Sequence, residues 1–389
     1  MKVPLLDLKA QYSKIKKELD DALIVVAESQ YFILGPEVEK METAMNEYIG
    51  CKASIGVSSG TDALLVSLMA LDIQPGDEVI MPAYSFFATA GVVSRLNAKP
   101  VFCDVDPVTF NIDTDKIEEL ITEKTKAITP VHLYGQCADM DKIMEIAKKH
   151  NLAVIEDAAQ AIGSQYKDGR DAGTIGDLGC FSFFPSKNLG CFGDGGLVSA
   201  MDEDLAEKVR ILRVHGGKPK YYHRIIGGNF RIDAIQAAVI NVKLPYLNDW
   251  SAERQNNANL YTKLFVEKDL AVEEGITDFD SNNKVLLPKP VYKEFDLPRY
   301  HIYNQYIIRV ENRDELREHL KQKEIGTEIY YPVPFHMQDC FAYLGYKEGD
   351  FPVSEFCANT SIALPIYPEL TEEQIGYTVD SISEFIFKS

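Results

Sequence analysis

The chain lacks an apolar run long enough to span a membrane, and its first residues, Met1–Asp7, lack the apolar region of a signal peptide. Its seven cysteines are scattered, odd in number and without a CxxC pair, which argues against a disulfide framework and a zinc site. Basic residues are scarce, since 40 Lys and Arg stand against 59 Asp and Glu and the net charge is −19. Nucleic acids and acidic membranes require basic patches. We therefore expect a cytoplasmic protein with reduced thiols and with neither nucleic acid nor a membrane as partner.

Short apolar runs alternate with helical stretches between residues 53 and 200. Seven runs predict strands, at residues 53–57, 78–81, 100–104, 127–131, 153–156, 179–183 and 196–200. Helices are expected at residues 14–29, 36–49, 61–71, 87–96, 114–121, 140–150 and 203–214. This alternation is typical of an α/β fold with a mostly parallel sheet. The chain of 389 residues is long enough for two domains, so we expect a large α/β domain over residues 1–249 and a smaller α+β domain over residues 250–389.

Lys187 and Asp157 form the most informative pair, because each follows a predicted strand. If these strands are parallel, both residues emerge at the same sheet edge, where open α/β sheets build ligand sites. Pyridoxal phosphate requires such a pair: an amine for a Schiff base and an anion beside the pyridinium nitrogen. Gln160 is placed to share a face with Asp157 and to bond the phenolic oxygen of the cofactor ring. A solvated lysine and a helix-capping aspartate are the alternatives.

Two turns supply further groups at the same predicted edge. Ser58–Leu64 leads from a strand into a helix, so its free N–H groups and hydroxyls suit a phosphate, and an ordinary N-cap is the alternative. Ser182 offers another donor. After the strand at residues 78–81, a ring among Tyr84, Phe86 and Phe87 is placed to stack on a planar cofactor. Packing in the core is the commoner use of such a ring, and the local pattern does not select one of the three.

Two segments farther along the chain carry weaker signals. Asn229-Phe-Arg231 opens a helix after a glycine-rich turn and can reach an anion, but a turn with a surface arginine explains it equally well. The segment Tyr330–Gln338 combines aromatic residues, prolines and His336. It suits the wall of a binding site, whereas a structural loop with a surface histidine is the alternative.

Taken together, these segments resemble the sugar aminotransferases of the DegT/DnrJ/EryC1/StrS family along nearly the whole chain. The stretches that carry the resemblance include Ser59–Leu64, Glu156–Gln160, Phe181–Lys187, Gly193–Gly196, Asn229–Arg231 and Tyr331–His336. Each is weak alone, but their shared order and spacing are hard to obtain by chance. The resemblance implies the type I fold of pyridoxal phosphate-dependent transferases, with a seven-stranded, mostly parallel sheet and a smaller C-terminal α+β domain.

The resemblance also implies roles at the cofactor. Lys187 would form the Schiff base with pyridoxal 5'-phosphate and shuttle the proton. Asp157 would pair with the pyridinium nitrogen, and Gln160 with the ring hydroxyl. The family's spacing selects Phe86 as the stacking ring. The phosphate would be held by Gly60, Thr61 and Ser182.

Other implied roles involve a second subunit and the substrate. Asn229 would reach the phosphate in the neighbouring subunit, so a homodimer with shared active sites is expected. Three residues would lie near the sugar nucleotide, some of them across the dimer interface: Arg231, Tyr331 and His336. Relatives with histidine at the lysine position are dehydratases, so the intact Lys187 favours amine transfer. No metal is expected.

The expected reaction moves an amino group from glutamate to a keto group of a nucleotide-linked sugar, for polysaccharide or amino-sugar biosynthesis. The segment Tyr134–Asp139 resembles members that act on UDP- or dTDP-linked 3-keto sugars, including the 3-keto-N-acetylglucosaminuronate type, so C3 is favoured. A 4-keto-6-deoxy sugar is the alternative. Two other classes stay open: a cysteine desulfurase with Cys340 as nucleophile, and a regulatory protein that holds the cofactor without turnover.

Overall fold

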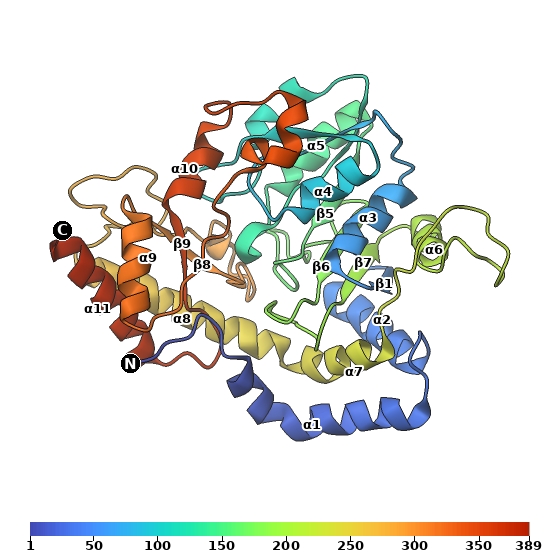
Figure 1. Ribbon diagram of the computed structural model, residues 1–389, viewed down its shortest axis with the longest axis horizontal. Helices are drawn as coiled ribbons and strands as arrows, with labels where there is room; N and C mark the ends of the chain where they lie inside the picture. Colours follow the sequence, from blue (N-terminus) through green and yellow to red (C-terminus); the bar gives the residue numbers. More distant parts are fainter. Residues whose placement is uncertain (389) are drawn as a thin grey trace.

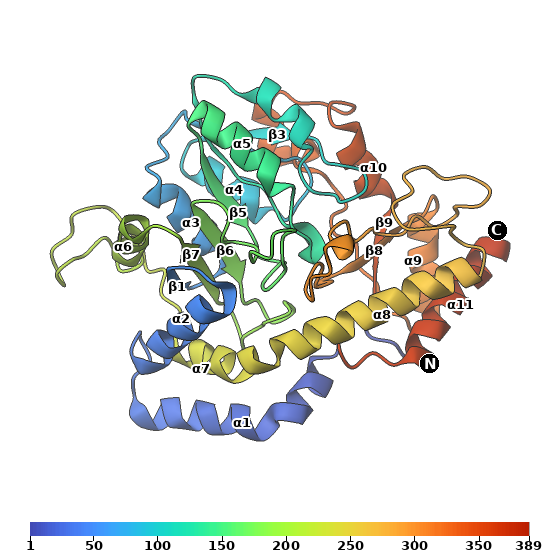
Figure 2. The ribbon, with the colours of Figure 1, turned by 180° about the vertical axis from the view of Figure 1, so that it is seen from behind.

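A seven-stranded sheet forms the centre of the protein, described here for residues 1–388 of a computed structural model (Figures 1 and 2). The strand order is β1 (Ala53–Val57), β7 (Gly196–Ala200), β6 (Leu178–Ser182), β5 (Ala153–Asp157), β4 (Thr125–Ile128), β2 (Glu78–Pro82) and β3 (Lys99–Cys103). β7 is antiparallel to both of its neighbours, and the other pairs are parallel. The expected α/β fold with a mostly parallel sheet is confirmed.

Helices cover both faces of the sheet, which explains why its strands are apolar throughout instead of alternating. One face packs against α2 (Pro36–Ile49), α5 (Met140–His150) and α7 (Ala234–Lys243), with α1 (Leu8–Ser29) lying along α7. The other face packs against α3 (Gly60–Ala70), α4 (Ala88–Arg95) and α6 (Glu203–Leu212). None of the helices within residues 1–388 is long and apolar enough to cross a membrane.

A second, smaller core lies toward the C-terminus. The long helix α8 (Leu247–Glu267) leads into it from α7 (Figure 2). This core contains the antiparallel pair β8 (Tyr306–Arg309) and β9 (Ser361–Leu364), together with α9 (Arg313–Gln322) and α11 (Glu372–Lys388). Val3 is buried in the same core, so the start of the chain also packs there. The helix α10 (Pro352–Thr360) instead packs through Cys357 and Ala358 into a cluster that includes Tyr84 and Tyr134. The domain boundary expected at residue 249 stays a prediction.

The structure differs from the expected elements in two places. The α-helix expected at residues 114–121 is wrong, because this segment forms two short 3₁₀ turns, η1 (Thr114–Lys116) and η2 (Glu118–Leu120). The Asp113 side chain accepts the Asp115 N–H at the first turn, and short connecting segments of this kind often adopt 3₁₀ geometry. β9 and α10 were not expected. β9 has four residues and pairs with a strand more than fifty positions earlier, so its local pattern carries little signal.

Candidate active site

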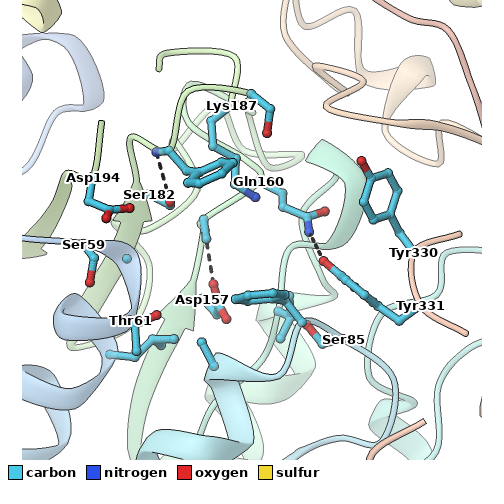
Figure 3. A pocket seen from close by; sticks show the side chains of 18 of the residues that line it. Ser59, Thr61, Ser85, Asp157, Gln160, Ser182, Lys187, Asp194, Tyr330 and Tyr331 are labelled. Atoms are coloured by element: carbon cyan, nitrogen blue, oxygen red, sulfur yellow. Dashed lines mark hydrogen bonds between the residues drawn. The ribbon is translucent and has the colours of Figure 1, made fainter. Parts of the chain in front are cut away.

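A cavity of about 420 Å³ opens at the carboxyl ends of the central strands (Figure 3). Turns that follow β1, β2, β5 and β6 all contribute to its wall, as expected for the ligand edge of an α/β sheet. Eight residues singled out from the sequence line it: Gly60, Thr61, Phe86, Asp157, Gln160, Ser182, Lys187 and Tyr331. Because β5 and β6 are parallel, Asp157 and Lys187 meet here from different strands.

Lys187 lies in the loop after β6 and reaches into the cavity (Figure 3). The side chain keeps partial exposure through the cavity, but protein surrounds its amine closely. Burial lowers the pKa of Lys187 to about 8, although the nearby Asp157 carboxylate raises it. A substantial fraction of this amine is therefore neutral near physiological pH. Only the neutral amine can attack a carbonyl carbon or accept a proton.

Asp157 ends β5 and is 4% exposed. Its Oδ2 accepts a hydrogen bond from Thr89 Oγ1 at 2.7 Å, and its Oδ1 accepts one from the Ala159 N–H at 3.2 Å. Burial raises the pKa of Asp157, while these donors and Lys187 oppose that rise. The carboxylate is held in one orientation at the base of the cavity. No helix begins at Asp157, so it is not a helix cap.

Glu156 points away from the cavity and is fully buried. Its carboxylate accepts bonds from the N–H groups of Gly173, Ile175 and Gly176 and from His132 Nε2. Burial alone would raise the pKa of Glu156, but these donors outweigh burial and lower it. His132 Nδ1 accepts the Ala138 N–H at 3.0 Å, which assigns the ring proton to Nε2. This network braces the end of β5 behind Asp157.

The N-terminus of α3 forms a cup with the end of β6. Ser59 caps the helix by accepting the Asp62 N–H at 3.0 Å, so the ordinary capping function expected as the alternative is present. The first-turn N–H groups of Gly60 and Thr61 and the hydroxyls of Thr61 and Ser182 suit a phosphate. A Cβ on Gly60 would lie 2.7 Å from the Ser182 Cβ. Glycine therefore permits this close approach of helix and strand.

One of the three aromatic candidates faces the cavity. Phe86 lines it, with its ring 6.0 Å from that of Tyr331. Phe87 instead stacks on Phe341 at 5.6 Å, and Tyr84 is fully buried beside the site. Phosphate donors, an amine, an anion and a ring thus line one cavity, an arrangement that fits pyridoxal phosphate.

Three sequence-predicted residues lie elsewhere within the chain. Asn229 is exposed, and the backbone of Arg231 pairs with that of Val57. Neither Asn229 nor Arg231 belongs to the described residues that line the cavity. His336 is buried rather than a surface residue: its Nε2 lies 2.9 Å from Glu355 Oε1. Their expected roles stay predictions. Cys340 is exposed on η7 (Asp339–Leu344), also outside the described cavity lining.

Other residues of the site were not singled out from the sequence. Thr89 follows Phe86 by three positions, and its contact with Asp157 requires the first turn of α4 to lie against the end of β5 in space. Within residues 1–388 no group of three or more His, Cys, Asp or Glu side chains is arranged to hold a metal. The cavity wall also contains Ser85, Asp194, Gln305 and Tyr330.

Two curated relatives resemble the chain over nearly its whole length. The "Pleiotropic regulatory protein" of Geobacillus stearothermophilus is 50% identical over 99% of this chain and 99% of its own. The UDP-N-acetyl-3-dehydro-alpha-D-glucosamine 3-aminotransferase of Acidithiobacillus ferrooxidans is 40% identical over 96% of this chain and 95% of its own. Catalytic and regulatory names thus both occur among similar proteins.

Two solved structures also match nearly the whole of this chain. DesV of S. venezuelae, in complex with a ketimine intermediate, has a TM-score of 0.90 at 38% identity, covering 99% of this chain and 98% of its own. NtdA of Bacillus subtilis, with bound cofactor PMP, has a TM-score of 0.89 at 32% identity, covering 100% and 86%. Residues 13–383 match the profile of the DegT/DnrJ/EryC1/StrS aminotransferase family. The chain therefore belongs to the DegT/DnrJ/EryC1/StrS aminotransferase family, which confirms the expected fold, the enzyme class and pyridoxal phosphate as cofactor.

Proposed function

We propose that this protein transfers an amino group from glutamate to the C3 keto group of a nucleotide-linked sugar. The observation that carries the proposal is the intact Lys187, whose amine shares one cavity with the Asp157 carboxylate and a phosphate cup. The bound cofactor would act as an electron sink for the substrate carbon. A regulatory protein that only held the cofactor would not need a free amine to move a substrate proton, so a response to glutamate distinguishes the two functions.

Each residue of the cavity has a distinct task in this proposal. Lys187 would hold the cofactor covalently and, once its amine is free, take and return the proton at the substrate carbon. Asp157 would keep the pyridine nitrogen protonated, and Thr89 would hold that carboxylate in place. Gln160 would donate to the ring oxygen, with Phe86 against the ring face. The phosphate would be held by Gly60, Thr61 and Ser182.

The choice of C3 rests on two supports. The Acidithiobacillus ferrooxidans relative is named as a 3-aminotransferase of a 3-dehydro sugar. The segment Tyr134–Asp139, whose likeness to members acting on 3-keto sugars favoured C3, adjoins the cavity wall at its first residue, since the Tyr134 N–H donates to Gln160. A sugar with a uronate carboxylate is one candidate of this type, and a 4-keto-6-deoxy sugar is the competing substrate.

A half-reaction screen tests the proposed function. The protein is first incubated with pyridoxal phosphate and glutamate, which should convert it to the pyridoxamine form and release 2-oxoglutarate. After removal of glutamate, 3-keto and 4-keto nucleotide sugars are added separately. We expect the absorbance of the lysine-bound cofactor to return only with a 3-keto sugar. Return with a 4-keto sugar alone would assign the competing substrate, and no response to glutamate would favour the regulatory function.

We propose further that the active unit is a homodimer. The loop after α6, residues 215–227, extends from the body of the protein (Figures 1 and 2). It contains Lys218, Lys220 and Arg224 and no acidic residue, although the chain as a whole is strongly acidic. Two of its apolar side chains are unusually open, with Tyr221 80% and Ile226 90% exposed. In a dimer, the partner subunit would cover these two side chains. The basic groups of the loop would then lie near the phosphates of the nucleotide sugar bound in the partner subunit.

Mixed dimers test whether Asn229 acts across subunits. Asn229→Ala alone should lower turnover about tenfold or more through loss of a bond to a charged phosphate, and Lys187→Ala alone should be inactive. In a mixed dimer, one site combines the intact Lys187 of one chain with the intact Asn229 of the other. Co-expression of the two variants should therefore restore about a quarter of the wild-type activity. A shared site would be contradicted if the co-expressed mixture were no more active than the Asn229→Ala homodimers that it contains.

A further inference from the structure

Two buried tyrosines outside the cavity form hydrogen bonds with the backbone of a segment that lines the cavity. Tyr84 follows β2, and Tyr134 lies in the turn after β4. The Tyr84 hydroxyl donates to the Tyr330 carbonyl at 2.7 Å and accepts the Tyr331 N–H at 2.8 Å. The Tyr134 hydroxyl donates to the same carbonyl. Both hydroxyls therefore act on the peptide that joins Tyr330 and Tyr331, whose side chains line the cavity.

The same residues orient the amide of Gln160. Its Oε1 accepts the Tyr134 N–H at 2.8 Å, and its Nε2 donates to the Tyr331 hydroxyl at 2.9 Å (Figure 3). These bonds occupy the amide oxygen and one of the two hydrogens on Nε2. One N–H of Gln160 remains for a ligand in the cavity. Backbone and side-chain bonds thus form a closed ring from Tyr84 through Tyr331, Gln160 and Tyr134.

We propose that Tyr84 and Tyr134 are positioning residues of the active site. By holding the Tyr330–Tyr331 peptide, they fix the Tyr331 phenol, which turns the free N–H of Gln160 toward the ring oxygen of the cofactor. The inference rests on the proposed cofactor roles of Lys187 and Gln160. It explains why tyrosines occupy these buried positions.

The hydroxyl of Tyr84 is not needed for packing. Its ring stacks on Phe110 with centroids 6.5 Å apart, and the side chain is fully buried. A phenylalanine would fill the same space, whereas it would leave the Tyr331 N–H without its present acceptor. A buried N–H without an acceptor costs free energy, so the Tyr331 backbone should shift toward another acceptor. The Tyr331 phenol would move with it and no longer hold the Gln160 amide.

Tyr84→Phe tests this inference in the cofactor-loaded protein without any sugar. The nitrogen joining Lys187 to the cofactor titrates in the absorbance spectrum. The Gln160 N–H stabilises the ring oxygen most when this nitrogen has lost its proton, because the oxygen charge is then uncompensated. Loss of that donor should therefore raise the midpoint of the absorbance titration, by about one pH unit for one hydrogen bond to a charged group. The titratable side chains that line the cavity, Asp157, Asp194, Tyr330 and Tyr331, are unchanged.

Controls separate positioning from general damage. Tyr166 is fully buried, accepts the Asp141 N–H and donates to Asp139, but does not line the described cavity. Tyr166→Phe should lower the melting temperature without moving the titration. In a Gln160→Ala background, Tyr84→Phe should add no further shift, because it acts through that amide.

Three results would overturn the inference: a folded Tyr84→Phe protein with a wild-type titration, an equal shift in Tyr166→Phe, or full additivity with Gln160→Ala. Tyr134→Phe provides a second route if Tyr84→Phe does not fold. It should shift the titration in the same direction but less, since the Tyr84 hydroxyl would still hold both the Tyr330 carbonyl and the Tyr331 N–H. The proposed sugar reaction can fail independently, because the titration requires neither amino donor nor acceptor.

Discussion

Lys187→Ala should abolish amine transfer, with a loss of at least about 10⁴-fold in turnover. The variant loses both the amine that binds the cofactor and the base that moves the substrate proton. Reduction with borohydride followed by mass spectrometry should find the cofactor on wild-type protein and on no lysine of the variant. The covalent bond should also form faster as the pH rises through about 8, because burial lowers the pKa of Lys187 to about 8 and the neutral amine reacts.

Lys243 provides a matched control. Burial also lowers its pKa to about 8, but its Nζ donates to the Gly190 carbonyl at 2.6 Å and lies outside the described cavity lining. Lys243→Met should lose stability yet keep the reducible cofactor bond on Lys187. A lowered pKa alone would then not account for reactivity. Covalent cofactor on another lysine of Lys187→Ala with wild-type turnover would contradict our assignment.

Asp157→Asn should reduce turnover about 10²- to 10³-fold while preserving the fold. Asparagine keeps the shape and the bond from Thr89, but it loses the bond from the Ala159 N–H and removes the charge that would keep the cofactor nitrogen protonated. Burial raises the pKa of Asp157, so its ionised form costs folding free energy at neutral pH. Removal of the buried charge should offset the lost Ala159 bond, so the cofactor-free variant should melt close to the wild-type temperature. Pre-steady-state kinetics of the glutamate half-reaction measure the chemical loss, and an unchanged rate would contradict the role of Asp157.

Glu156→Gln is the contrasting control one residue away. Because glutamine keeps only one oxygen, its NH2 group would face either the N–H groups of Ile175 and Gly176 or those of Gly173 and His132. We expect a loss of about 2–4 kcal/mol in the free energy of unfolding, measured by denaturant titration. Because the folded pKa of Glu156 is lowered from 4.5, its stabilising contribution exists above the unfolded pKa and disappears as the pH falls through the folded pKa. The variant should lack that acid-dependent loss.

Several site residues could be predicted because their signals are local. Asp157 ends one apolar run, Lys187 follows another, and the Ser59–Thr61 turn joins a strand to a helix. Only one further assumption, that their strands are parallel, was required to bring them together, and β5 and β6 satisfy it. The selection of Phe86 was different, because local pattern left three rings open. The family resemblance selected it, and packing directs Phe87 and Tyr84 elsewhere.

Other residues gave no local signal because their roles depend on distant partners. Thr89 contacts Asp157 across 68 positions, and Tyr84 contacts the Tyr331 backbone across 247. His336 looked like a surface residue in its loop, yet Glu355 and the ring of Phe351, 4.8 Å away, bury it. The hydrophobic pattern of the sequence does not indicate such contacts, since they form only when the chain is folded.

Residue types and their local order establish the class of fold and the reacting groups, because strand–helix alternation and turn chemistry act over a few neighbouring positions. Long-range packing determines the pKa, the orientation and the free hydrogen-bond donors of those groups. It lowers the pKa of Lys187 by burial, orients Asp157 through Thr89, and leaves Gln160 with one N–H for a ligand. Desolvation and hydrogen bonds between distant segments produce these properties, and neither exists in the unfolded chain.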